Sequence, residues 1–100
     1  MEYRKHKRKP IELHISFAGE QVVGKGTVCN ISLVGCGVNS QEKVTAGAFL
    51  EVLIHLPGGQ DLIKIDVAVV RYALPDRFGL DFLQISPGEQ QKLNKLLKSR

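Results

Sequence analysis

The feature that most constrains the fold of this chain is a period-two alternation of apolar and polar residues that recurs in short segments. In the first segment Ile11, Leu13, Ile15 and Phe17 alternate with polar residues. This pattern is typical of a half-buried strand, whose successive side chains point to opposite faces. Five further strands are predicted over residues 22–31, 35–39, 49–56, 62–72 and 78–82. Their connections are short and contain no helical pattern, so we expect antiparallel pairing.

The period changes near the end of the chain. Ser86 and Glu89 have the spacing of a capping box, Pro87 takes the first helical position, and leucines follow at helical intervals. We therefore expect one amphipathic helix over residues 87–99. A six-stranded antiparallel sheet must protect its edges, and closure removes them. The predicted fold is mostly β: a six-stranded antiparallel β-barrel with a C-terminal α-helix over one opening or face.

Two details inside the strands are also predicted. Gly24 and Gly26 indicate a bulge or sharp curl in the 22–31 strand. In the 62–72 strand, Tyr72 is expected on the polar face. The opposite, apolar face of that strand is predicted to consist of Ile63, Ile65, Val67 and Val69.

All of the net charge lies at the N-terminus. Residues 1–10 carry five lysines and arginines and one acid, which gives +4, and the remaining ninety residues carry nine basic and nine acidic groups. We expect residues 1–10 to form a flexible basic arm and residues 11–100 to form a single domain. No apolar run is long enough to cross a bilayer and no signal-peptide core follows the basic start, so a cytoplasmic location without membrane insertion is predicted.

Little in the sequence indicates catalysis or metal binding. Cys29 and Cys36 are seven residues apart, and the three histidines do not cluster near them. Both cysteines are expected to be small buried apolar residues. No nucleophile, phosphate-loop or dinucleotide motif is present. We predict a binding protein with no catalytic residues, no metal and no cofactor.

One constellation does indicate a ligand. Arg4 and Arg8 are four residues apart, and Asn30, Ser32 and Gly35 follow as NxSxxG. An arginine fork binds phosphate or the O6/N7 edge of guanine, a serine hydroxyl donates to phosphate, and an asparagine oxygen accepts from guanine N–H groups. We expect Gly35 to permit a left-handed backbone and to leave room for a ligand. These groups suit a compact, doubly charged guanine nucleotide.

The facing of these side chains follows from strand geometry. Asn30 and Ser32 are two residues apart, so they are expected to share the outward face at the end of a strand. Cys29 and Ile31 are then expected to face the core.

The order and spacing of the five residues resemble the PilZ family, bacterial receptors for cyclic di-GMP. The resemblance extends over nearly the whole chain, including VVRY at residues 69–72 and FGLDFLQISPGEQQKL at residues 78–93. It implies a six-stranded antiparallel barrel with a terminal helix. It assigns the ligand contacts to Arg4, Arg8, Asn30, Ser32, Gly35 and Tyr72. By that resemblance the arginines bind guanine edges and phosphates, and Tyr72 stacks near the ligand.

The resemblance implies a receptor that orders its arginine arm around cyclic di-GMP and signals to a separate, unidentified protein partner. Motility, pilus, biofilm or exopolysaccharide control are the processes it suggests. The chain is expected to be a monomer or a ligand-dependent dimer, with one or two ligand molecules per site. Two alternatives stay open: a PilZ-like protein-interaction module without ligand, and a small-barrel nucleic-acid binder. The neutral body supplies no basic stripe, so no nucleic-acid partner is expected.

Overall fold

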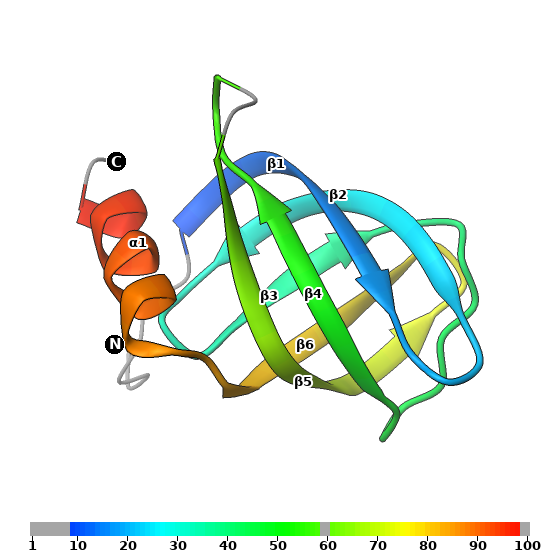
Figure 1. Ribbon diagram of the computed structural model, residues 1–100. Coiled ribbons are helices and arrows are strands. Elements are labelled where there is room, and N and C mark those ends of the chain that lie inside the picture. Colours follow the sequence, from blue (N-terminus) through cyan, green and yellow to red (C-terminus); the bar gives the residue numbers. More distant parts are fainter. Residues whose placement is uncertain (1–8, 59–60, 99–100) are drawn as a thin grey trace, which may run out of the picture.

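Six strands close into an antiparallel barrel, and a single helix follows them (Figure 1). The computed structural model describes residues 9–58 and 61–98, with side chains from Ile11 onwards. The elements are β1 (Lys9–Ala18), β2 (Val23–Ile31), β3 (Gly35–Asn39), β4 (Phe49–His55), β5 (Leu62–Leu74), β6 (Arg77–Gln84) and α1 (Pro87–Lys98). The strand order around the barrel is β1-β2-β3-β6-β5-β4. The predicted fold class is confirmed.

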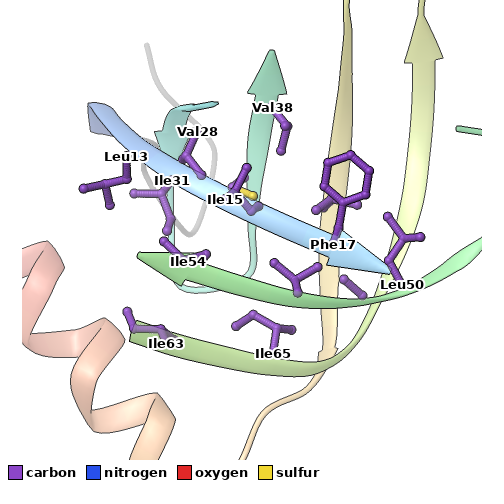
Figure 2. Packing of buried hydrophobic residues seen from close by; sticks show 14 of the residues in the cluster. Leu13, Ile15, Phe17, Val28, Ile31, Val38, Leu50, Ile54, Ile63 and Ile65 are labelled. Carbon is purple, nitrogen blue, oxygen red and sulfur yellow. The ribbon is translucent and has the colours of Figure 1, made fainter. Parts of the chain in front are cut away.

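The barrel interior is filled by the apolar residues of the period-two pattern (Figure 2). On β1, Ile15 and Phe17 are 1% and 2% exposed. Phe17 meets Phe78 of β6 edge to face, with ring centroids 5.2 Å apart and an interplanar angle of 86°, which is a favourable aromatic geometry. Leu93 of α1 is also fully buried and belongs to the same core. The core therefore joins the sheet to the helix.

The long strand β5 changes face part-way along. Ile63 and Ile65 point into the core as predicted, but Val67 and Val69 are only half-buried, and Ala68 takes the next core position. The cause is a register shift, because β4 pairs Val52 with Ile65 and Leu50 with Ala68. One extra residue on β5 turns the following side chains over. The prediction that Val67 and Val69 belong to the core face was wrong.

The irregularity in β2 lies elsewhere than predicted. Gly24 and Gly26 pair in regular register with Phe17 and Ile15 of β1. The register shift in β2 falls between Val28 and Asn30, at its pairing with β3. A Cβ on Gly26 would lie 2.5 Å from the Asn39 carbonyl oxygen. This glycine therefore allows β2 to approach β3 closely and does not mark a bulge.

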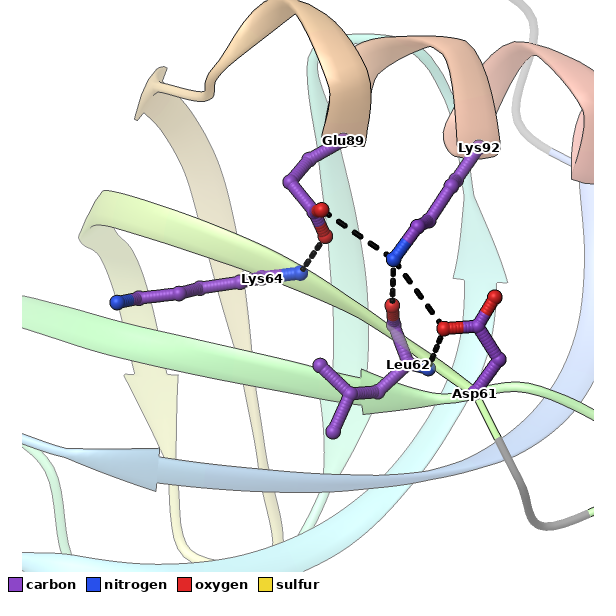
Figure 3. A network of polar contacts seen from close by, with 5 residues as sticks. All are labelled: Asp61, Leu62, Lys64, Glu89 and Lys92. Atoms are coloured by element: carbon purple, nitrogen blue, oxygen red, sulfur yellow. Dashed lines mark hydrogen bonds and ion pairs between the residues drawn. The ribbon is translucent and has the colours of Figure 1, made fainter.

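Helix α1 is fixed to the start of β5 by a polar network (Figure 3). Glu89 Oε1 accepts from the backbone N–H of Lys64 at 2.7 Å, so this carboxylate bonds to the sheet instead of closing the predicted capping box. Lys92 Nζ lies 3.2 Å from Glu89 Oε2 and donates to Asp61 Oδ1 at 3.2 Å and to Leu62 O at 3.0 Å. These bonds join the helix to the strand beside the buried leucines of α1.

The same contacts shift the titration of all three charged groups. The Lys64 N–H lowers the pKa of the Glu89 carboxyl, and the Leu62 N–H, then Lys92, lower the pKa of Asp61. The Asp61 carboxylate raises the pKa of Lys92. Each shift favours the charged form of its group, as expected for hydrogen-bonded ion pairs.

Candidate functional site

The NxSxxG segment lies at the end of β2 and in the turn that leads to β3. Asn30 pairs with Gly37 of β3 on one side and with Pro10 of β1 on the other. Because the β2 bulge precedes it, Asn30 shares its side of the strand with Cys29, and its Nδ2 lies 3.6 Å from the Cys29 sulfur. Cys29 is therefore only half-buried. The prediction that Cys29 faces the core was wrong, whereas Cys36 is buried as expected.

Ser32 is almost fully buried, at 1% exposed, and its hydroxyl holds the turn. The hydroxyl oxygen accepts from the Val34 N–H at 3.1 Å, and the hydroxyl donates to Gly35 O at 3.5 Å. The backbone N–H of Ser32 also donates to Gly35 O, at 2.9 Å. A serine that bonds the backbone two residues on is typical of tight turns. Asn30 and Ser32 therefore do not form the shared outward pair that their spacing predicted.

Gly35 is required for a reason other than the predicted one. Among the described glycines, only Gly47 and Gly58 have positive φ, so Gly35 is not left-handed. A Cβ added at Gly35 would instead collide with the carbonyl oxygen of Leu80 and lie 3.3 Å from its carbonyl carbon. β6 therefore runs directly against Gly35. The glycine brings the NxSxxG turn close to β6.

Tyr72 lies on the same outer surface as Asn30. The register gives one continuous cross-strand row: Asn30 of β2 beside Gly37 of β3, Gly37 beside Gly79 of β6, and Gly79 beside Tyr72 of β5. Tyr72 is 46% exposed, and the core side chains of β3 and β6 lie at the alternate positions. The structure thus brings two of the predicted site residues, Asn30 and Tyr72, to the two ends of a row whose middle positions are glycines. We call this row the glycine-floored strip.

Three residues of this surface were missed by sequence reasoning. Gly37 and Gly79 were not singled out, and only the register shows that they are neighbours. Arg71 follows the buried Val70 and faces outward. A register shift between Val70 and Tyr72 then keeps Tyr72 on the same side as Arg71, opposite Gly79. Arg71 Nη1 lies 3.7 Å from Asp81 Oδ1, and its side chain is 66% exposed. The basic-aromatic pair in VVRY was the available signal.

Arg4 and Arg8 lie outside the described residues. The first described residue, Lys9, pairs with Ile31 across β1 and β2, one position from Asn30 and one from Ser32. The described barrel therefore begins directly beside the NxSxxG segment.

Two open hollows lie on other parts of the described surface. One hollow of about 410 Å³ is lined by outward residues of β1, β2 and β4, including Ser16, Lys25 and Leu53. Another, of about 480 Å³, lies between residues 19–22 and 43–50. Neither includes the NxSxxG segment or Tyr72. Over residues 9–58 and 61–98, no group of three or more His, Cys, Asp or Glu is placed to hold a metal ion, and α1 is neither long nor apolar enough to cross a membrane.

A comparison with protein families decides the classification. The family model for the PilZ domain matches residues 2–99. The chain belongs to the PilZ domain family. The match spans both the basic N-terminus and the NxSxxG segment, so the resemblance noted from the sequence is confirmed at the level of the family. No curated protein sequence matches this PilZ chain significantly.

Solved structures show the same PilZ fold at low sequence identity. The inhibitor of motility MotI/DgrA from Bacillus subtilis is 24% identical, with a TM-score of 0.77 over 100% of this chain and 54% of that one. YcgR from Escherichia coli in complex with cyclic di-GMP is 16% identical, with a TM-score of 0.77 over 96% of this chain and 45% of that one. This chain thus spans about half the length of these two proteins.

A third neighbour is covered by this chain over almost its whole length. The PilZ domain of CeSA from a cellulose-synthesising bacterium is 14% identical, with a TM-score of 0.74 over 93% of this chain and 96% of that one. PilZ domains are receptor and regulatory modules. At the level of the family, membership supports a role related to cyclic di-GMP, whereas the three neighbours show the shared fold.

Proposed function

We propose that this PilZ domain is a receptor for cyclic di-GMP, bound on the outer strip between Asn30 and Tyr72. The observation that carries the proposal is the convergence of three features at one edge of the barrel. The NxSxxG turn, the glycine-floored row and the residue that follows the arginine arm all meet there. In the sequence the two arginines lie just before Lys9, and residues 11–100 carry no net charge.

Each site residue has a chemical task in this proposal. Arg4 and Arg8 supply guanidinium forks for guanine edges and phosphate oxygens. The Asn30 amide accepts from a guanine N–H group. Asparagine offers one acceptor oxygen where a carboxylate offers two, so we expect Asn30→Asp to bind guanine more tightly.

Ser32 takes part through a local change in the turn. Its donor bond to Gly35 O is 3.5 Å long, which is the weak end of hydrogen-bond geometry. Little free energy is therefore lost when the hydroxyl donates to a phosphate oxygen instead, and the hydroxyl oxygen can still accept from Val34 N–H. Because Ser32 is 1% exposed, a phosphate reaches it only when the 32–35 turn moves outward.

The proposed output is an order-disorder switch. Bonds from Arg4 and Arg8 to the ligand offset the entropy of fixing the arm, and the ordered arm presents a new surface to a separate protein partner. Control of motility, pili, biofilm or exopolysaccharide is the setting proposed for that partner. Since the contacts are charged, affinity is expected to fall as salt is raised.

Titration of nitrogen-15-labelled protein with cyclic di-GMP tests the site and the switch together. The expected result is that amide shifts concentrate at residues 30–37 and at Gly79, while the hollow around Ser16 and Leu53 stays unchanged. The heteronuclear NOE and the transverse relaxation rates of residues 1–8 are expected to rise to the values of the barrel. Cyclic di-AMP is the matched control, because it keeps the phosphates and alters the base edges. Shift changes confined to the hollow, or a basic arm that relaxes equally with and without ligand, would contradict the proposal.

One observation favours a second candidate, a PilZ module that binds proteins and no nucleotide. The Ser32 hydroxyl is buried and already bonded to the backbone within its own turn. In that case the turn is complete without a phosphate. The same titration decides between the two, since a protein-binding module shows no shifts with cyclic di-GMP at any concentration.

A further inference from the structure

Tyr72 and Gly79 are packed against each other on the outer surface of the barrel. They are paired across β5 and β6. A Cβ built on Gly79 would lie 2.9 Å from Cδ2 of the Tyr72 ring, 3.0 Å from Cζ, and closer still to Cε2, the carbon between them. Any side chain at position 79 would occupy the space that the tyrosine ring now fills.

The pattern of those three approaches gives the orientation of the ring. A contact in the ring plane would leave the two flanking carbons much farther away than Cε2. Contact through the ring face leaves all three at similar distances, as found here. The Tyr72 ring therefore lies with one face toward Gly79, and the residue as a whole is 46% exposed.

Asn30 lies on Gly37 in the same way, one strand pair along the row. A Cβ on Gly37 would be 2.9 Å from Asn30 Nδ2 and 3.2 Å from Oδ1. Gly37 and Gly79 are themselves paired. The Tyr72 ring and the Asn30 amide therefore lie over the adjacent strands β6 and β3, and such neighbouring strands are about 5 Å apart. Neither glycine has positive φ, so what these positions need is the absence of a side chain rather than an unusual backbone.

We propose that Gly79 is a positioning residue that holds the Tyr72 ring flat as a stacking platform for a planar base. This inference rests on the proposed function and deepens it, since it assigns the place of one base. A base on the outer ring face would present its edge to the Asn30 amide across the Gly37–Gly79 strip. Stacking tolerates any base, and an amide with a donor and an acceptor discriminates among base edges. The platform thus fits a purine with polar edges, such as guanine.

A purely structural role for the packing makes a different prediction. Aromatic side chains also cover glycines to stabilise sheets. In that case Gly79→Ala lowers stability, but the folded fraction binds ligand as the wild type does. The positioning role requires instead that Gly79 act on affinity through Tyr72.

A double-mutant cycle on ligand affinity separates the two roles. Cyclic di-GMP is titrated calorimetrically into wild type, Tyr72→Leu, Gly79→Ala and the double variant, well below each melting temperature. We expect Tyr72→Leu to weaken binding by about 5- to 140-fold, the loss of one base-aromatic stack. Gly79→Ala is expected to weaken binding by about 5-fold or more, and to add nothing in the Tyr72→Leu background. Gly88→Ala is the control, because a Cβ there meets no atom within 4 Å.

The outcomes are distinguishable from failure of the proposed function. If wild type binds and the two losses add, or Gly79→Ala binds like wild type, the positioning role is refuted while the receptor stands. If wild type shows no binding, the proposed function itself fails.

A measurement without ligand keeps the geometry testable when Gly79→Ala does not fold. One Gly79 Hα is expected to resonate upfield, under the ring current of Tyr72. The shift should persist in Tyr72→Phe and disappear in Tyr72→Leu. An ordinary Gly79 Hα shift in the wild type would overturn the platform.

Discussion

Replacing Gly35 by alanine is predicted to force β3 away from β6. The new Cβ would collide with the Leu80 carbonyl oxygen, a backbone atom that cannot rotate aside. Overpacking of this kind costs about 1–3 kcal/mol. The adjacent bond from Phe82 N–H to Val34 O, 2.8 Å long, weakens as the strands separate and adds about 1 kcal/mol. We therefore expect Gly35→Ala to lower the free energy of unfolding by about 2–4 kcal/mol.

Thermal unfolding followed by circular dichroism measures this loss. In a domain of this size each kcal/mol lowers Tm by about 4–8 °C, so a fall of about 10–30 °C is expected. Gly35→Asn should be at least as damaging, since asparagine carries the same Cβ and more atoms.

Gly47 provides the matched control, because its φ is 93° and a Cβ there meets no atom within 4 Å. At that position asparagine, which tolerates left-handed backbone, should cost less than alanine. The reasoning about Gly35 would be refuted if Gly35→Asn were clearly better tolerated than Gly35→Ala, as at Gly47.

Three further predictions concern the helix and the thiols. Leu93→Ala removes a fully buried side chain, so urea unfolding should show a loss of about 2–5 kcal/mol. The pKa values of Asp61 and Glu89, which bond to Lys92, are lowered, and the pKa of Lys92 is raised. The stabilisation of the fold by these groups is therefore complete near neutral pH. It is lost as pH falls through the carboxyl pKa values or rises through the lysine pKa. Lys92→Met should therefore narrow the Tm difference between about pH 7 and about pH 3, and an unchanged difference would contradict this network. Native protein should react with a thiol reagent at Cys29, and at Cys36 only on unfolding, as judged by mass spectrometry of the labelled peptides.

The strand pattern predicted the barrel because each strand alternates locally, and alternation needs no knowledge of partners. The places where it failed are bulges. In β5 the core positions pass from Ile65 to Ala68, because β4 advances by two residues while β5 advances by three. Val67 looks like a core valine in sequence, and only the pairing shows otherwise.

The same limit applied to the candidate site. Strand spacing placed Asn30 and Ser32 together on one face, but the bulge at Cys29 and the turn at Ser32 direct them differently. The need for glycine at position 35 depends on Leu80, forty-five residues later in the chain. Close approaches between distant segments leave no local signal, which is why the reason for that glycine was predicted wrongly.

Gly37 and Gly79 show what register adds to a motif. Each is an unremarked glycine inside a predicted strand, and forty-two residues separate them. Pairing of β3 with β6 brings them side by side and places Asn30 and Tyr72 at the two ends of the row. Three-dimensional pairing thus connects site residues that the sequence offers separately.

The most direct test of the central claim is calorimetric titration of the protein with cyclic di-GMP, with Arg8→Ala and Lys7→Ala titrated alongside. Both variants lose one positive charge from the same arm, but only Arg8 belongs to the RxxxR motif. We predict saturable binding by wild type and Lys7→Ala, and its loss in Arg8→Ala. Absence of binding by the wild-type protein, or equal weakening by the two substitutions, would contradict the account.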